Sequence, residues 1–353
     1  MKAKKTIICI LTATVFLAGT VQALDYDERR ILFGENYAQI EKIAAGSVPV
    51  LKENLAAVKK SAETFHRYYS EYALEEPVFY REKAGSTAFY RAIFGIREAS
   101  FTAFAIENLQ LFLVERNGRL FLLHACYLYK KDTGDGTVHS YRTKIYENIT
   151  VVKSRDSFDL LAHITTDVND TDLDFSDGSD EPHLRIEYSG SGEATFYRLG
   201  DVLKAADSAK STVGAIAEIS VKPYRTAECG RTLIDEERPF MYTIQNAFDG
   251  DRATSYVEDS GDDGISITVT AADGKISRIG IMNGYAKSES LYAANNRIKT
   301  FTLNGAEHSL ADGFPKGYAY FPAGGAKSVT LRSTALYKGS RFTDTCIADI
   351  IVE

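Results

Sequence analysis

The chain has 353 residues, 44% of them hydrophobic and 25% charged, with a formal net charge of -7. Neither Lys nor Arg gathers into a basic stripe, so the sequence lacks the electrostatic footprint of a nucleic-acid-binding protein. A chain of this length can form two or three ordinary domains. It contains no Trp but 21 Tyr and 19 Phe, so tyrosine must supply the aromatic contacts of any binding surface.

The N-terminus has the pattern of a secretory signal peptide at residues 1–23. Lysines at positions 2, 4 and 5 precede an uncharged run that ends in Val21-Gln22-Ala23. Threonines dilute the run, which argues against a membrane anchor, and no cysteine follows it where lipid attachment would require one. We therefore expect a secreted or periplasmic protein with no membrane span in the mature chain.

Residues 24–210 are predicted to form an α+β domain of unknown function in which the helices come first. Apolar residues at helical spacing indicate one helix from Asp27 to Ala45 and a second that begins at Pro49. The short connection between them favours an αα-hairpin. A further helix is expected near residues 201–209, at the end of the domain.

An antiparallel sheet is expected between these helices. Segments rich in Phe, Leu, Val and Tyr run from Ser100 to Lys130, and Asn117-Gly118 between two of them is typical of a hairpin turn. Further strand candidates are Ser140–Tyr146, Asn148–Lys153, Asp159–Ile164, Leu184–Tyr188 and Ala194–Arg198.

Acidic residues crowd the segment 167–181, and their oxygens are of the type that binds calcium. The spacing departs from the helix-loop-helix calcium pattern, because Asp177 rather than Gly178 falls at the turn position. A solvated acidic loop is therefore the interpretation that we favour.

The sequence contains no catalytic motif. His124 and Cys126 fall on one face of a strand by alternation, and a buried structural pair is a simpler interpretation than a reactive thiol–imidazole pair. His163 and His183 stand near the acidic segment and could add nitrogen ligands there, but their spacing matches no zinc motif. A hydrolase with its site in residues 80–200 is one alternative for the function of the chain.

From Ala215 onward, short strands alternate with Gly, Asp and Asn turns. Ile265, Ile267 and Val269 alternate with polar neighbours, as a sheet with one buried face requires. The pattern predicts an all-β sandwich or barrel in residues 215–353. The expected strands begin at Ala215, Gly264, Ile276, Arg297, Lys327 and Cys346.

Three separated strings in this region resemble a known family. They are NAFDGDRATSYVE from Asn246, IGIMNGYAKSESLYAANNRIKTFTLNG from Ile279, and FTDTCIADIIV near the C-terminus. In this order they are similar to the discoidin-type domain attached to streptococcal NAD-glycohydrolase, a glycan-binding or translocation module related to coagulation factor V/VIII C-type domains. The resemblance implies a galactose-binding-like jelly-roll sandwich and does not extend to a catalytic domain. Tyr256 stands where the family usually has Trp, which keeps an aromatic plug of smaller area.

The turn Asp249-Gly250-Asp251, with Thr254, gathers hard oxygen ligands. In related sandwiches this turn binds a structural calcium ion, closed by a carboxylate of the final strand; the matching residue here is Asp349, where the family usually has Glu. The metal ligands that the resemblance implies are Asp249, Asp251, Thr254 and Asp349. A hydrogen-bonded Asx turn without metal is the alternative.

The loop from Asn283 to Arg297 is the first candidate for the ligand site, because aromatic rings and polar side chains bind sugars through stacking and hydrogen bonds. Packing of the tyrosines beneath the loop is the alternative, and the loop from Phe314 to Phe321 is the second candidate. The predicted ligand-binding residues are Tyr285, Lys287, Tyr292, Asn295, Asn296 and Arg297.

Removal of the leader leaves Cys126, Cys229 and Cys346. Cys229 near the start of the C-terminal domain and Cys346 in its last strand could be bridged in a sandwich whose termini adjoin. We therefore expect a Cys229–Cys346 disulfide and a buried Cys126 thiol in an apolar strand.

Together these features predict an exported, non-catalytic protein whose C-terminal domain recognises glycan at a cell or envelope surface. The alternative is an interaction or translocation module, in which that domain recognises a protein and the N-terminal domain is the effector. The expected partner is a glycan or a cell-surface protein rather than nucleic acid, and the only expected cofactor is structural calcium.

Overall fold

The computed structural model describes residues 28–66, 73–97, 104–133, 139–154, 157–173, 189–210, 215–235, 238–259 and 264–353. The expected signal peptide, the acidic segment after Leu173, His183 and the strand expected at Leu184–Tyr188 lie outside these residues. Within them, no helix combines the length and the apolar character that crossing a membrane requires.

The prediction of one helix from Asp27 to Ala45 is wrong over most of its length. Helix α1 (Glu28–Phe33) is followed by a 3-10 helix, η1 (Gly34–Gln39), and by strand β1 (Glu41–Ile43). Gly34 has a φ of 70°, and a Cβ there would lie 2.6 Å from a backbone oxygen. This left-handed glycine ends the helix, so the expected αα-hairpin does not form.

The second helix is confirmed as α2 (Pro49–His66). Its buried side chains include Val50, Leu51, Val58 and Ala62, which recur at helical spacing and pack on the apolar face of the N-terminal sheet. A short 3-10 helix, η2 (Ala45–Ser47), precedes it.

The predicted antiparallel sheet is present and contains more strands than expected. Asn117 and Gly118 have φ values of 53° and 72°, as a type I′ hairpin turn requires. Helix α3 (Leu199–Ser208) follows the last of these strands. Besides the edge strand β1, the strands are β2 (Ala73–Leu74), β3 (Val78–Ala84), β4 (Thr87–Arg97), β5 (Phe104–Arg116), β6 (Arg119–Thr133), β7 (His139–Ser154), β8 (Ser157–Leu173) and β9 (Ser189–Arg198).

A buried ion pair holds the β3–β4 hairpin against β7. The side chains of Arg91 on β4 and Glu82 on β3 form this pair and are 0% and 4% exposed. Glu82 also accepts hydrogen bonds from the Thr150 hydroxyl at 3.2 Å and from the Val151 N–H at 3.0 Å. The N-terminal sheet is therefore curled, with charged side chains enclosed on its inner side.

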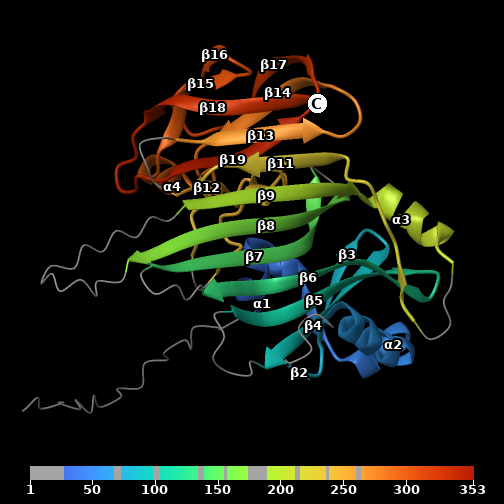
Figure 1. Ribbon diagram of the computed structural model, residues 1–353. Coiled ribbons are helices and arrows are strands. Elements are labelled where there is room, and N and C mark those ends of the chain that lie inside the picture. The colour runs from blue at the N-terminus through green and yellow to red at the C-terminus, as the bar shows by residue number, and fades with distance from the viewer. Residues whose placement is uncertain are drawn as a thin grey trace, which may run out of the picture.

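The N-terminal sheet continues without a break into the C-terminal region (Figure 1). Strand β9 pairs with β11 (Arg225–Cys229) along the whole length of β11. The strand expected at Ala215 is reduced to β10 (Ala217–Glu218), which pairs in parallel with β6 of the N-terminal sheet. The boundary expected at residues 210–215 therefore does not separate two sheets, because the pairing of β9 with β11 crosses it.

The predicted β-sandwich is confirmed in the C-terminal region, and its strands pair antiparallel within each layer. The first layer is the end of the long sheet and consists, in spatial order, of β11, β13 (Ser266–Ala271), β18 (Ser328–Tyr337), β15 (Arg297–Leu303) and β16 (Ala306–Ser309). The second layer, the four-stranded sheet, consists of β12 (Tyr256–Glu258), β19 (Thr345–Val352), β14 (Ile276–Asn283) and β17 (Ala319–Ala326).

Among the described residues of the sandwich, two short helices lie in its loops. They are the 3-10 helix η4 (Ile244–Ala247) and helix α4 (Glu289–Ala294). The Ser288 side chain caps α4 by accepting a hydrogen bond from the Leu291 N–H.

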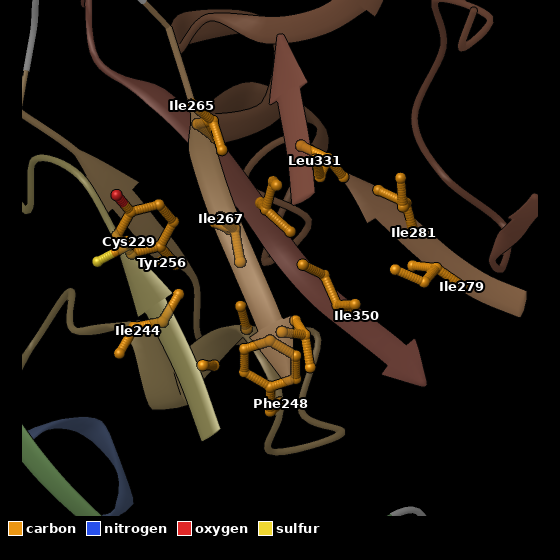
Figure 2. Packing of buried hydrophobic residues seen from close by; sticks show 14 of the residues in the cluster. Cys229, Ile244, Phe248, Tyr256, Ile265, Ile267, Ile279, Ile281, Leu331 and Ile350 are labelled. Carbon is orange, nitrogen blue, oxygen red and sulfur yellow. The ribbon is translucent and has the colours of Figure 1, made fainter. Parts of the chain in front are cut away.

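The largest hydrophobic cluster lies between the two layers of the sandwich and extends into the N-terminal sheet. Figure 2 shows the part between the two layers, where Ile267 of the long sheet and Ile350 of the four-stranded sheet point into the same cluster. Phe196 of β9 belongs to the same cluster and packs edge-on against Phe248, with ring centroids 5.4 Å apart. The core also includes Val152, Ala162, Ile164, Ala194 and the aromatic plug Tyr256, all fully buried.

Candidate functional site

The four metal ligands that the resemblance implies lie together. Asp249 accepts hydrogen bonds from the Asp251 N–H at 2.8 Å and from the Thr254 hydroxyl at 2.7 Å. Asp349 of β19 accepts a hydrogen bond from the Gly250 N–H at 3.4 Å. The fold thus brings the turn and the final strand into contact across about a hundred residues of sequence.

Two buried carboxylates determine the electrostatics of this cluster. Asp249 and Asp349 are 2% and 1% exposed. Burial, and also the nearby charge of Asp349, raise the pKa of Asp249 well above its usual value. Burial raises the pKa of Asp349 to about 6, although the Tyr318 hydroxyl, which donates a hydrogen bond to it, acts in the opposite direction.

The donor set fits a hard divalent cation, because such an ion would offset the cost of burying two carboxylates side by side. Asp249, Asp251, Thr254 and Asp349 would hold it. The same oxygens also accept hydrogen bonds within the turn, as the metal-free Asx turn requires. A bound calcium ion and a metal-free Asx turn are both compatible with this arrangement, and they differ in the response of the protein to calcium.

We expect calcium to stabilise the protein through this cluster. Adding Ca²⁺ to the chelator-treated full-length chain should raise its melting temperature, since a ligand that binds the native state alone stabilises it by mass action. Asp249→Asn should abolish the rise, whereas Asp273→Asn, at an exposed aspartate, should preserve it. Differential scanning calorimetry measures the melting temperatures of the wild type and of the two variants with and without calcium. A melting curve of the wild type that calcium leaves unchanged would favour the metal-free turn.

The first candidate ligand loop is packed beneath the surface, so the predicted ligand-contact role is not supported for five of its six residues. Of the six, only Lys287 is exposed. The buried five are Tyr285 at 7% exposure, Tyr292 at 5%, Asn295 at 6%, Asn296 at 2% and Arg297 at 7%.

The polar groups of this loop are used inside the protein. Arg297 donates hydrogen bonds to both carboxylate oxygens of Asp312, each at 3.1 Å. Asn296 donates to the backbone oxygen of Thr343 at 2.5 Å and accepts from the Gly339 N–H at 2.7 Å. These side chains fix the conformation of neighbouring loops, so residue types that suit sugar binding serve packing in this loop, as the alternative interpretation of the sequence allowed.

The second candidate loop, from Phe314 to Phe321, does reach the surface. Tyr320 on β17 is 45% exposed, the most of any large hydrophobic side chain in the part of the chain that the structure describes. It pairs across strands with Gly280 of β14, where a Cβ would come within 2.8 Å of the tyrosine ring. The ring therefore rests on the outer face of the four-stranded sheet, over the space that a glycine leaves free.

Polar groups lie beside this ring. The Arg278 guanidinium is 4.7 Å from the Tyr320 ring centroid and donates a hydrogen bond to Glu353 at 2.5 Å. The Tyr318 ring lies 6.2 Å from that of Tyr320, and its hydroxyl links this surface to Asp349 of the predicted calcium cluster. We call this surface the outer-face patch; it consists of Arg278, Gly280, Tyr318, Tyr320 and Glu353.

A polar pocket of about 400 Å³ opens elsewhere on the sandwich. Its lining includes two exposed arginines and the buried carboxylate of Glu258, but no aromatic ring. It therefore suits a charged or strongly polar ligand better than one held by stacking. The lining residues are Gly230, Arg231, Glu258, Gly264, Ser266 and Arg332.

The predicted Cys229–Cys346 disulfide is wrong, because Cys126, Cys229 and Cys346 are all free and buried. The Cys229 thiol belongs to the core between the layers and lies 3.2 Å from the Thr232 hydroxyl. Cys346 packs in a different cluster, with Val257. The two strands lie in opposite layers of the sandwich, and their thiols belong to separate clusters.

The antiparallel two-layer architecture defines the C-terminal region as a β-sandwich domain of the discoidin-like class. Residues 224–353 match the family model described as NAD glycohydrolase translocation F5/8 type C domain. The match begins one residue before β11. The resemblance predicted from the sequence strings is confirmed for this part of the chain.

Two solved structures are similar to part of the chain. One is described as CBM32 of AlyQ in complex with 4,5-unsaturated mannuronic acid; it is 10% identical, with a TM-score of 0.24, and the match covers 36% of this chain and 92% of that one. The other is a Ruminococcus gnavus GH29 fucosidase mutant in complex with fucose, 14% identical with a TM-score of 0.24, and the match covers 36% of this chain and 25% of that one. Scores this low do not bear on fold or function. No curated protein matches the chain.

Proposed function

We propose that this chain is an exported binding protein that recognises a carbohydrate at a cell or envelope surface through the outer-face patch of its C-terminal sandwich. The family match at residues 224–353 supports a binding or translocation-related module. The exposed ring of Tyr320 is the observation that carries the choice of a carbohydrate. The proposed role requires no catalytic step.

The chemistry of the outer-face patch suits a sugar ring. A pyranose has a face of C–H groups, which stacks on an aromatic ring, and a rim of hydroxyls, which hydrogen-bond to charged side chains. Tyr320 offers the ring, Arg278 the donors and Glu353 the acceptors. Because Gly280 leaves room for the Tyr320 ring and Asp349 tethers Tyr318, the surface is largely ordered before a ligand arrives, which lowers the entropic cost of binding.

The second candidate function is recognition of a protein during translocation, which the description of the matched family as a translocation domain favours. In that case the sandwich docks the chain on its partner, and the N-terminal sheet is the effector. The two candidates differ in what the sandwich retains, a sugar or a polypeptide.

A glycan array separates these candidates. The full-length mature chain is the correct probe, because the shared core would be cut open in an isolated C-terminal fragment. We expect binding to a subset of immobilised oligosaccharides and a loss of at least about tenfold in affinity for Tyr320→Ala, equal to about 1.4 kcal/mol.

Phe342→Ala is the matched control for this experiment, because Phe342 is also an exposed aromatic, at 37%, and lies outside the outer-face patch. Its array profile should equal that of the wild type. An array that retains nothing, together with a polypeptide that binds the same chain with a dependence on Tyr320, would replace the carbohydrate proposal with the translocation role.

A further inference from the structure

Four side chains with metal-binding groups converge in the N-terminal sheet, far in sequence from the sandwich loops. They are His124 and Cys126 on β6, Glu147 on β7 and His163 on β8, and one ligand atom of each lies within 4.8 Å of the others. The His163 Nε2 is 2.8 Å from the Glu147 carboxylate, and the rings of the two histidines have centroids 4.0 Å apart.

Two irregularities in β6 turn His124 and Cys126 toward this cluster. Leu123 and Leu128 of β6 each lack a partner residue on β5, so the register between these two strands shifts at both positions. A bulge of this kind redirects the side chains that follow it, and bulges are over-represented beside functional sites. Between the two shifts, His124 and Cys126 share one face of the strand, as alternation predicted.

The strands beside this segment separate, which makes room for the cluster. In the described residues, β6 pairs with β7 from Tyr129 onward, whereas at Phe121 it pairs with β10 instead. On the facing edge of β7, the N–H groups of Ile149 and Val151 donate to side-chain oxygens. The ladder is thus opened at the position where the four side chains meet.

The charges of the cluster suit a cation. Burial raises the pKa of Glu147, but its interactions with the two imidazoles outweigh this effect and lower it to about 2, so the carboxylate is ionised at neutral pH. Burial lowers the pKa of His124, which keeps its imidazole neutral and able to act as a ligand. The His124 Nε2 is buried and has no hydrogen-bond partner among the described residues, while Glu147 lies 4.0 Å away.

We propose that His124, Cys126, Glu147 and His163 bind one zinc ion. Imidazole, thiolate and carboxylate are all ligands that zinc accepts in four-coordinate sites. Zinc–ligand lengths of about 2.0–2.3 Å place the ligand atoms of a tetrahedral site about 3.3–3.8 Å apart, so the largest separation in this cluster would shorten by about 1 Å. Binding requires the loss of the thiol proton of Cys126, since burial raises the pKa of this group.

The site is open to solvent on one side. The side chains of His124, Glu147 and His163 are 25%, 24% and 17% exposed, which gives a metal ion a path to its ligands. Cys126 lies deeper and is held by the side chain of Gln110, whose Nε2 is 3.5 Å from its sulfur. The zinc ion would link three neighbouring strands where the backbone ladder between two of them is interrupted.

Metal titration of the full-length chain tests this site. After treatment with a chelator, the chain should take up one equivalent of Zn²⁺ in competition with a chromophoric indicator. His163→Gln and His124→Gln should each weaken zinc binding by at least about tenfold. Bound Co²⁺ should give visible absorption bands with the intensity that is typical of tetrahedral coordination. It should also give a thiolate charge-transfer band, which Cys126→Ser should remove.

Two controls keep the outcome clear. His308→Gln, at a histidine of the sandwich, and Asp249→Asn, in the predicted calcium cluster, should leave zinc uptake unchanged. The Co²⁺ spectrum of the wild type is informative even if a variant fails to fold. Circular dichroism shows whether each variant keeps its secondary structure. A wild-type spectrum without a thiolate band, or zinc binding that both histidine variants leave unaltered, would overturn the proposal and leave a hydrogen-bonded cluster instead.

Discussion

Replacing Phe196 with alanine is expected to lower the free energy of unfolding of the whole chain by about 3–5 kcal/mol. Phe196 is fully buried and lies on β9 of the N-terminal sheet, but its ring packs against Phe248 of the C-terminal region. Because the sheet and the core are both shared across this boundary, the two regions should unfold in a single transition. Denaturant unfolding, followed by far-UV circular dichroism and by tyrosine fluorescence, should show both signals shifting together.

The control for this substitution is Phe342→Ala, at an aromatic residue that is 37% exposed. It should change the free energy of unfolding by no more than about 0.5 kcal/mol. Two resolved transitions, of which Phe196→Ala moves only one, would show that the two regions fold independently.

Removing the charge of Glu82 is expected to cost about 3–5 kcal/mol of stability, because it leaves the guanidinium of Arg91 buried without its counter-ion. Glu82→Gln preserves the size of the side chain and an acceptor for the Val151 N–H, so the decrease in the free energy of unfolding reports mainly on the lost charge. The double variant Glu82→Gln, Arg91→Met should cost less than the sum of the two single variants, since it removes both charges together. Denaturant unfolding of the four proteins gives the coupling energy.

The matched control is an exposed ion pair that joins β1 to β3. Arg81 is the neighbour of Glu82 and pairs with Glu41 at 2.6 Å, but these two side chains are 27% and 60% exposed. Glu41→Gln should therefore cost at most about 1 kcal/mol. Equal costs for Glu41→Gln and Glu82→Gln would contradict the assigned role of the buried pair.

Local sequence patterns predicted the elements that are determined by residues close together in the sequence. Helix α2 follows from the spacing of its apolar residues after Pro49, and the β5–β6 hairpin follows from Asn117-Gly118. The strands of the sandwich follow from alternation between turns, and the family resemblance placed Asp349 beside the turn at Asp249, which the structure confirms as neighbours.

The features that the sequence did not predict depend on pairing between distant segments. Nothing in Arg225–Cys229 indicates that its partner is β9. His124 and Cys126 could be placed on one face, but Glu147 and His163 join them only through the register of β7 and β8. The polar side chains of the Asn283–Arg297 loop resembled a ligand site because their hydrogen-bond partners, such as Asp312, lie outside the loop.

The central claim is that the outer-face patch, rather than the polar pocket, is where the sandwich binds a carbohydrate. Isothermal titration of the sugar that the array retains, against the wild type, Tyr320→Ala and Arg332→Ala, tests it most directly. We predict that Tyr320→Ala weakens binding by at least about tenfold and that Arg332→Ala leaves the affinity unchanged. If Tyr320→Ala kept the wild-type affinity for the sugar and Arg332→Ala lost affinity, the result would contradict the claim and assign the ligand to the pocket.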